Sequence, residues 1–170
     1  MKDIVSTSMK AQADKPTQLE PGERLFLWGF RALAQHRHCG HPVLTALREC
    51  YSRFGVEDAA VLVDALADAF FHAAHTPIAI HSAPCPCVSD DEALLLRAMA
   101  SAQFGDRAAA RQRLAHWLPE AAAEWVLGPA TELGRLFHAA GLSFCLAEVD
   151  GDATVQTATQ SWPIGSRTVH

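Results

Sequence analysis

Apolar side chains recur every three or four residues along most of this chain, and that spacing constrains its fold more than any other feature. Val43, Leu47, Cys50 and Phe54 form one such series. Because an α-helix completes a turn in about 3.6 residues, residues spaced in this way lie on one helical face. Glycine and proline residues interrupt the pattern at short intervals, and both residue types end or restart helices. The sequence therefore predicts an all-α protein.

We expect about six helices that pack as a compact bundle. The predicted helices span, in order, residues 23–35, 42–54, 57–75, 89–104, 106–117 and 119–140. The first is apolar on nearly every side, as a central, buried helix should be. The last contains Gly128-Pro129, which we expect to break or kink it. Trp28, Trp117 and Trp125 are predicted core residues.

The helical pattern does not cover the whole chain. Residues 1–20 are polar and predict a flexible N-terminal arm, whereas residues 21–149 form the helical domain and residues 150–170 follow it. Asp150-Gly151-Asp152 lies between apolar or β-branched segments, a pattern typical of a hairpin turn. The C-terminal segment is therefore expected to be either a strand of a small β-hairpin or an extended tail.

The charge balance argues against a nucleic-acid partner. The chain has a formal net charge of −5 and a pI near 5.9, with no run of Lys or Arg to neutralise phosphates. No apolar run approaches the roughly 20 residues that span a bilayer, and residues 1–20 lack the layout of a signal peptide. We therefore expect a cytoplasmic protein that binds neither nucleic acid nor a membrane, with a homo-oligomer or a protein partner left open.

The motif that most suggests chemistry is Cys85-Pro86-Cys87. Pro86 favours an extended conformation at the residue before it, and residues two apart in an extended segment point to the same side. Thiolate and imidazole groups are preferred ligands of zinc and of other transition metals. Cys85 and Cys87 are therefore the first two predicted ligands of a site for zinc or another transition metal.

Further ligand types lie in a second loop and just before the cysteines. His38, Cys39 and His41 follow the first predicted helix, and His81 precedes the Cys-Pro-Cys motif. In an up-and-down bundle with short connections, the loops after the first and third helices lie at the same end. We therefore expect His38, Cys39, His41 or His81 to complete a metal site with the two cysteines.

Other interpretations of these residues stay open. The motif could be only a tight interhelical connection whose cysteines pack as small apolar side chains, or the thiols could act as a redox pair. The apolar content of 49%, the arm and Trp162 also suit an interaction module or a homodimer without metal. Common catalytic motifs are absent, although a Cys–His nucleophile pair would leave no local signature. The leading hypothesis is a metal-binding protein with a sensory or regulatory role rather than an enzyme.

A stripe of acidic and histidine residues on the third predicted helix has a simpler explanation. Asp64, Asp68, His72 and His75 share one helical face, and the opposite face is apolar. The stripe therefore predicts a face exposed to solvent rather than a metal centre.

A helix start follows the cysteines directly. Ser89-Asp90-Asp91-Glu92 has the spacing of a capping box, in which the Ser and Glu side chains each accept a hydrogen bond from a backbone N–H of the first turn. We therefore expect a helix to begin at Ser89, two residues after Cys87.

The loop and this helix start resemble those of a family of small uncharacterised bacterial all-helical proteins. The resemblance rests on Ala83-Pro84-Cys85-Pro86-Cys87 and on the D-E-A-L-L-L sequence of residues 91–96. The order of helices over roughly residues 24–141 is similar as well. Family members have adjacent cysteines, whereas a proline separates them here. The resemblance implies an all-helical domain with an unusual loop, and it implies no particular activity.

Overall fold

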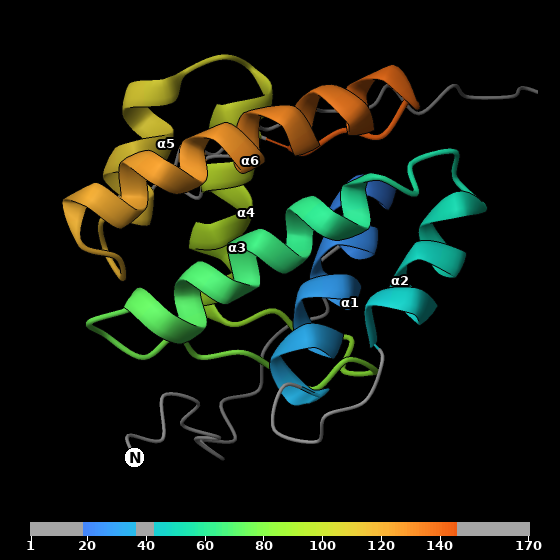
Figure 1. Ribbon diagram of the computed structural model, residues 1–170, viewed down its shortest axis with the longest axis horizontal. Coiled ribbons are helices and arrows are strands. Elements are labelled where there is room, and N and C mark those ends of the chain that lie inside the picture. The colour runs from blue at the N-terminus through green and yellow to red at the C-terminus, as the bar shows by residue number, and fades with distance from the viewer. Residues whose placement is uncertain (1–18, 37–42, 146–170) are drawn as a thin grey trace, which may run out of the picture.

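The computed structural model describes residues 19–36 and 43–145 of the chain, and these residues form six α-helices and no strand (Figure 1). The helices are α1 (Pro21–His36), α2 (Val43–Ser52), α3 (Ala59–Ala73), α4 (Asp90–Gln103), α5 (Arg107–Leu114) and α6 (Glu120–Ala139). The predicted all-α bundle is therefore confirmed. The hairpin or tail predicted at residues 150–170 and most of the arm predicted at residues 1–20 lie outside the described residues.

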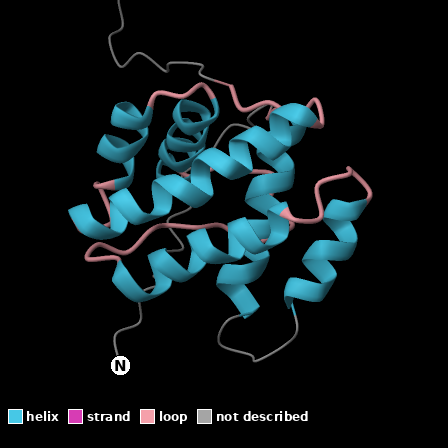
Figure 2. Ribbon diagram, turned by 45° about the horizontal axis from the view of Figure 1, so that its top comes forward, coloured by secondary structure: helices cyan, strands magenta, loops and turns pink. Residues whose placement is uncertain are grey.

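The helices pack as two groups that share α6. On one side α3 contacts α1, α2 and α6, and on the other α4 contacts α5 and α6 (Figure 1). Short loops join most neighbouring helices, but the connection between α3 and α4 is long and runs along the bundle (Figure 2). That connection carries the cysteine motif.

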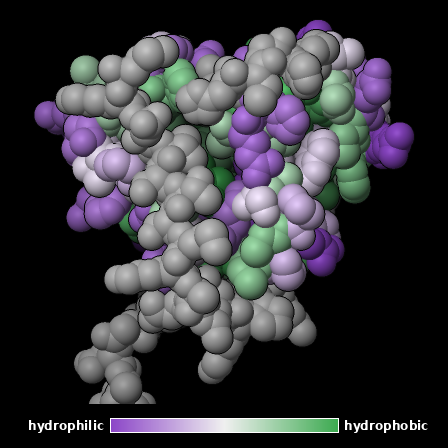
Figure 3. All heavy atoms as spheres, turned by 90° about the horizontal axis from the view of Figure 1, so that it is seen from below, coloured by the Kyte–Doolittle hydropathy of each residue, from purple (hydrophilic) through white to green (hydrophobic). Residues whose placement is uncertain are grey.

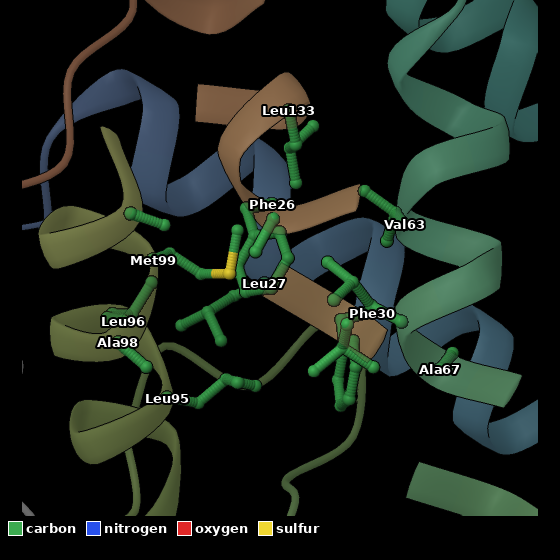
Figure 4. Close-up of a cluster of buried hydrophobic side chains, with 14 of the residues drawn as sticks. Phe26, Leu27, Phe30, Val63, Ala67, Leu95, Leu96, Ala98, Met99 and Leu133 are labelled. Carbon is green, nitrogen blue, oxygen red and sulfur yellow. The ribbon is translucent and has the colours of Figure 1, made fainter. Parts of the chain in front are cut away.

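The core is built around α1, as its apolar sequence predicts. Phe26, Leu27 and Phe30 are at most 1% exposed, and they meet side chains from α3, α4 and α6, among them Val63 and Met99 (Figure 4). A helix surrounded in this way must be apolar on most of its circumference.

The helix ends follow the predicted signals. Backbone N–H of Glu92 donates to Ser89 Oγ at 3.1 Å, and backbone N–H of Ser89 donates to Glu92 Oε2 at 2.9 Å, which completes the capping box. Gly55, Gly105 and Gly141 have φ angles of 71°, 82° and 73° just beyond the ends of α2, α4 and α6. Glycine adopts this left-handed conformation without the steric cost that a side chain incurs.

Of the break or kink predicted at Gly128-Pro129, the break is wrong, because α6 runs through both residues without interruption. Proline removes one helical hydrogen bond and crowds the carbonyl four residues earlier. Buried residues on either side of it, such as Val126, Leu127 and Ala130, hold the helix against the core. Packing therefore outweighs the local preference of the proline.

Two of the three tryptophans predicted to be core residues are exposed. Trp117 is fully buried, whereas Trp28 is 38% and Trp125 is 58% exposed. Trp125 immediately precedes Val126, which faces the core, and neighbouring residues of a helix point about 100° apart. Trp28 on α1 and Trp125 on α6 therefore lie on the outer sides of their helices, although the apolar pattern alone assigns them to the core.

Candidate functional site

The segment between α3 and α4, residues 74–89, contains Cys85-Pro86-Cys87, and we refer to it as the Cys-Pro-Cys loop. Its first residues are held by backbone N–H of His75, which donates to the carbonyl of Trp117 at 2.9 Å. Further along, backbone N–H of Ala79 donates to Asp91 Oδ2 at 2.6 Å, and Ser89 Oγ donates to the carbonyl of Ala79 at 2.6 Å. The loop thus returns on itself at the first turn of α4.

A buried ion pair lies beneath this loop. Arg31 of α1 and Glu92 of α4 form two parallel hydrogen bonds, Nε to Oε1 at 2.6 Å and Nη2 to Oε2 at 2.8 Å. Their side chains are 5% and 0% exposed. Such two-point contacts between a guanidinium and a carboxylate are short, strong and directional. The pair fixes the first turn of α4 against the second half of α1.

The same guanidinium binds the backbone of both cysteines. Nη1 of Arg31 donates to the carbonyl of Cys85 at 2.7 Å, and Nη2 donates to the carbonyl of Cys87 at 2.6 Å. A guanidinium offers donors in a rigid, planar fork. The two carbonyl groups must therefore face the same side of the chain to reach it.

The carboxylate of Glu92 organises the rest of the loop. Besides the two Arg31 bonds, Oε1 accepts from backbone N–H of His81 at 3.1 Å and Oε2 accepts from backbone N–H of Ser89 at 2.9 Å. A buried charge is tolerated when it is paired and fully hydrogen-bonded. These four bonds meet that requirement. Together with the two bonds from Arg31 to the cysteine carbonyls, they tie His81, Cys85, Cys87 and Ser89 to one ion pair.

Both cysteines of the motif are half-buried thiols rather than a disulfide. Backbone N–H of Cys85 donates to the carbonyl of Ser82 at 2.9 Å, closing a turn just before the motif. Residues 85–87 themselves are neither helix nor turn. When peptide groups two residues apart have the same orientation, the side chains of those residues also lie on one side. The Arg31 contacts therefore favour the shared orientation that the sequence predicts for the two sulfur atoms.

Three of the six predicted ligand residues lie in the described part of the chain. His81, Cys85 and Cys87 lie on one loop, and Nε2 of His81 is buried. His38, Cys39 and His41 lie outside the described residues. Within residues 19–36 and 43–145, no group of three or more His, Cys, Asp or Glu side chains is arranged to hold a metal ion.

The C-terminal half of helix α1 contacts the Cys-Pro-Cys loop, whereas the loop that follows α1 lies outside the described residues. Arg31 is five positions from the last residue of α1, His36, and it contacts the Cys-Pro-Cys loop directly. The C-terminal end of α1 and this loop lie at the same end of the bundle (Figure 1). Viewed from that end, the described surface intersperses hydrophilic and hydrophobic side chains (Figure 3).

The acidic and histidine stripe is exposed at His72 and at His75, which lies just beyond α3, whereas Asp64 and Asp68 are half-buried. The side chains of His72 and Asp68 are 70% and 46% exposed, and His72 Nε2 lies 3.9 Å from Asp68 Oδ1. An exposed pair at this distance adds little to stability.

Sequence reasoning missed Arg31 and the second role of Glu92. The available signal is a single arginine in Leu25–Leu33, a segment that is otherwise apolar or glycine. A charged residue within a helix that is apolar on nearly every side needs a buried partner. The partner is 61 positions away, so nothing local identifies it.

Comparison with known proteins yields no match to a family model, to a curated protein or to a solved structure. The resemblance to the bacterial helical family thus stays an expectation. None of the helices in the described part of the chain has the length and apolar character that a membrane crossing needs.

Proposed function

We propose that this protein binds a transition-metal ion, zinc in the first instance, through Cys85 and Cys87, in a sensory or regulatory rather than a catalytic role. The observation that carries the proposal is the attachment of both cysteine carbonyls to the one guanidinium of Arg31. It supports a pair of thiols that are held in a common orientation before any ion arrives.

A Cys-Pro-Cys loop that is already ordered before the metal ion arrives favours metal binding. Metal sites gain affinity when the groups around the ligands fix their orientation. Here the loop backbone is secured by the Arg31–Glu92 pair and by the Ala79 and Ser89 hydrogen bonds. Little additional ordering is then required when a metal ion joins the two sulfur atoms.

Two protein ligands rarely suffice for zinc, which prefers four-coordinate sites. His81 is the first candidate for a third ligand, because its backbone is bound by the carboxylate that orients Arg31. His38, Cys39 and His41 are the proposed source of the rest. The contact between α1 and the Cys-Pro-Cys loop supports their proximity.

The test is metal analysis of protein purified without a polyhistidine tag. We expect about one zinc or other transition-metal ion per chain, as for a structural zinc site. The ion should be lost from the Cys85→Ser/Cys87→Ser variant and retained by Cys145→Ser, which removes an exposed thiol outside the loop. Metal-free protein whose thermal stability is the same with and without the two cysteines would contradict the proposal.

A second candidate function is protein interaction, including self-association, and it is favoured by exposed aromatic side chains. Phe104 and Trp125 are 62% and 58% exposed. Large apolar side chains at a surface are candidate contacts when they form a continuous area. Light scattering after size exclusion, over a wide range of protein concentrations, measures self-association. A constant single-chain mass would exclude the homodimer.

A further inference from the structure

We infer that Arg31 holds Cys85 and Cys87 apart as two thiols and opposes the formation of a disulfide between them. The inference takes its biological meaning from the proposed metal site, since a disulfide would remove both ligands. Its physical basis is the loop geometry alone, so it can be tested without any metal.

The argument begins with the distances that a disulfide demands. A disulfide needs Cβ atoms about 3.5–4.5 Å apart and Cα atoms about 4.4–6.8 Å apart. An extended chain rises about 3.3 Å per residue, so Cα atoms two residues apart lie near the upper limit of that range. Their Cβ atoms point the same way and are separated by a similar distance. Closing the bond between Cys85 and Cys87 therefore requires the chain to bend at Pro86.

Bending at Pro86 is incompatible with the Arg31 contacts. It rotates the peptide group after Cys85 relative to the peptide group after Cys87, whereas Arg31 Nη1 and Nη2 hold the two carbonyls at 2.7 and 2.6 Å. Arg31 cannot move to follow either carbonyl, because Nε and Nη2 are bound to Glu92 in a buried position. Disulfide formation must therefore break at least one of these hydrogen bonds.

The size of the effect follows from the hydrogen bond that is lost. A charge-assisted hydrogen bond corresponds to roughly a tenfold change in an equilibrium constant, or somewhat more. The reaction is exchange with a small disulfide such as oxidised glutathione. The two cysteine thiols give up two electrons and two protons, and the glutathione disulfide accepts them to become two thiols. We expect folding to lower the equilibrium constant of this exchange about tenfold, a shift of about 30 mV.

The experiment uses the full chain with its other cysteines replaced, as Cys39→Ser, Cys50→Ala and Cys145→Ser, and with a chelator present. The protein is equilibrated with mixtures of reduced and oxidised glutathione. The remaining thiols are then blocked, and mass spectrometry counts the blocked cysteines. The same measurement in concentrated urea gives the equilibrium constant for the unfolded chain. The folded protein should form the disulfide about tenfold less readily than the unfolded chain.

Two variants separate the role of Arg31 from general stability. Arg31→Lys keeps a charge beside Glu92 but cannot donate to both carbonyls, so its equilibrium constant should rise close to the unfolded value. Asp106→Ala removes the side chain that caps the start of α5, away from the Cys-Pro-Cys loop and from Arg31, and it should keep the low value. Arg31→Gln, whose single amide reaches at most one carbonyl, replaces Arg31→Lys if circular dichroism shows that variant unfolded.

Two results would overturn the inference. One is a folded protein that forms the disulfide as readily as the unfolded chain. The other is a folded Arg31 variant that resists disulfide formation as strongly as its parent. A failure of the metal proposal would show instead as the absence of bound metal, and it would leave the glutathione equilibrium unchanged.

Discussion

The guanidinium of Arg31 and the carboxylate of Glu92 form a buried two-point ion pair that joins the middle of the fold to its most unusual loop. The pair links α1 to the first turn of α4. Its remaining hydrogen bonds reach the backbone of His81, Cys85, Cys87 and Ser89. Arg31 thus joins α1 to the capping residue Glu92 of α4, and it also binds the backbone that orients the two thiols.

Removing one member of this pair should destabilise the protein strongly. Arg31→Met leaves the carboxylate of Glu92 buried without its counter-charge, and breaking a buried pair in this way costs about 3–5 kcal/mol. Urea denaturation followed by circular dichroism measures the free energy of unfolding. The Arg31→Met protein should have a clearly lower midpoint, with an unchanged slope if the fold persists.

The chain contains a matched control for this experiment. Arg135 and Glu132 on α6 form the same two-point geometry, with hydrogen bonds of 2.9 and 2.6 Å, but in solvent. Arg135→Met should therefore leave the midpoint almost unchanged. Equal effects of the two substitutions would show that burial does not determine the importance of the Arg31–Glu92 pair.

Two glycines of α6 should respond differently to substitution by alanine. A Cβ atom at Gly134 would lie 2.7 Å from Cα of Gln103 in α4, whereas a Cβ atom at Gly128 would meet nothing within 4 Å beyond its own chain neighbours and helix backbone. Gly134→Ala should destabilise the protein by about 1–3 kcal/mol, because two helix backbones must separate. Gly128→Ala should be close to neutral, because the helix preference of alanine is offset by contact of its Cβ atom with the ring of Pro129. Thermal unfolding of both variants provides the comparison, and a stable Gly134→Ala protein would contradict the close contact between α4 and α6.

Tyr51, the chain's single tyrosine, should couple stability to alkaline pH. Its hydroxyl donates to the carbonyl of Leu25 at 3.1 Å, and burial, with a smaller contribution from Cys50, raises its pKa far above the usual value. The unfolded chain ionises at about pH 10, so stability is retained below that pH and falls as the pH rises above it.

Absorbance of the phenolate near 295 nm, recorded together with helix content, tests this coupling. Phenolate formation should coincide with loss of helix, and Tyr51→Phe should reduce the fall in stability at high pH. Ionisation near pH 10 in a protein that is still fully helical would contradict the buried hydrogen bond to Leu25.

The features of the fold that depend on neighbouring residues could be predicted from the sequence. The Ser89–Glu92 capping box and the glycines that end α2, α4 and α6 depend on positions within one turn. The central position of α1 also follows from its own composition. These predictions are correct because the interactions that determine them join residues close together in the sequence.

The predictions that were wrong concern features that depend on contacts between segments distant in the sequence. Pro129 lies inside α6 because neighbouring residues pack against other helices, and no local signal reports that packing. Trp125 is exposed because contacts of α6 with the other helices determine which of its faces is buried, and Trp125 lies outside that face. For the candidate site, the cysteine motif was recognisable, but its attachment to Arg31 joins positions 54 and 56 residues apart.

The most direct test of the proposed metal site is a titration of metal-free protein with Co²⁺, a spectroscopic substitute for zinc. Thiolate ligands give an intense charge-transfer band in the near ultraviolet. We predict that this band grows until about one Co²⁺ per chain has been added, both in the wild type and in Cys145→Ser. It should be absent from Cys85→Ser/Cys87→Ser. A wild-type protein without the band, or a double variant that retains it, would contradict the account.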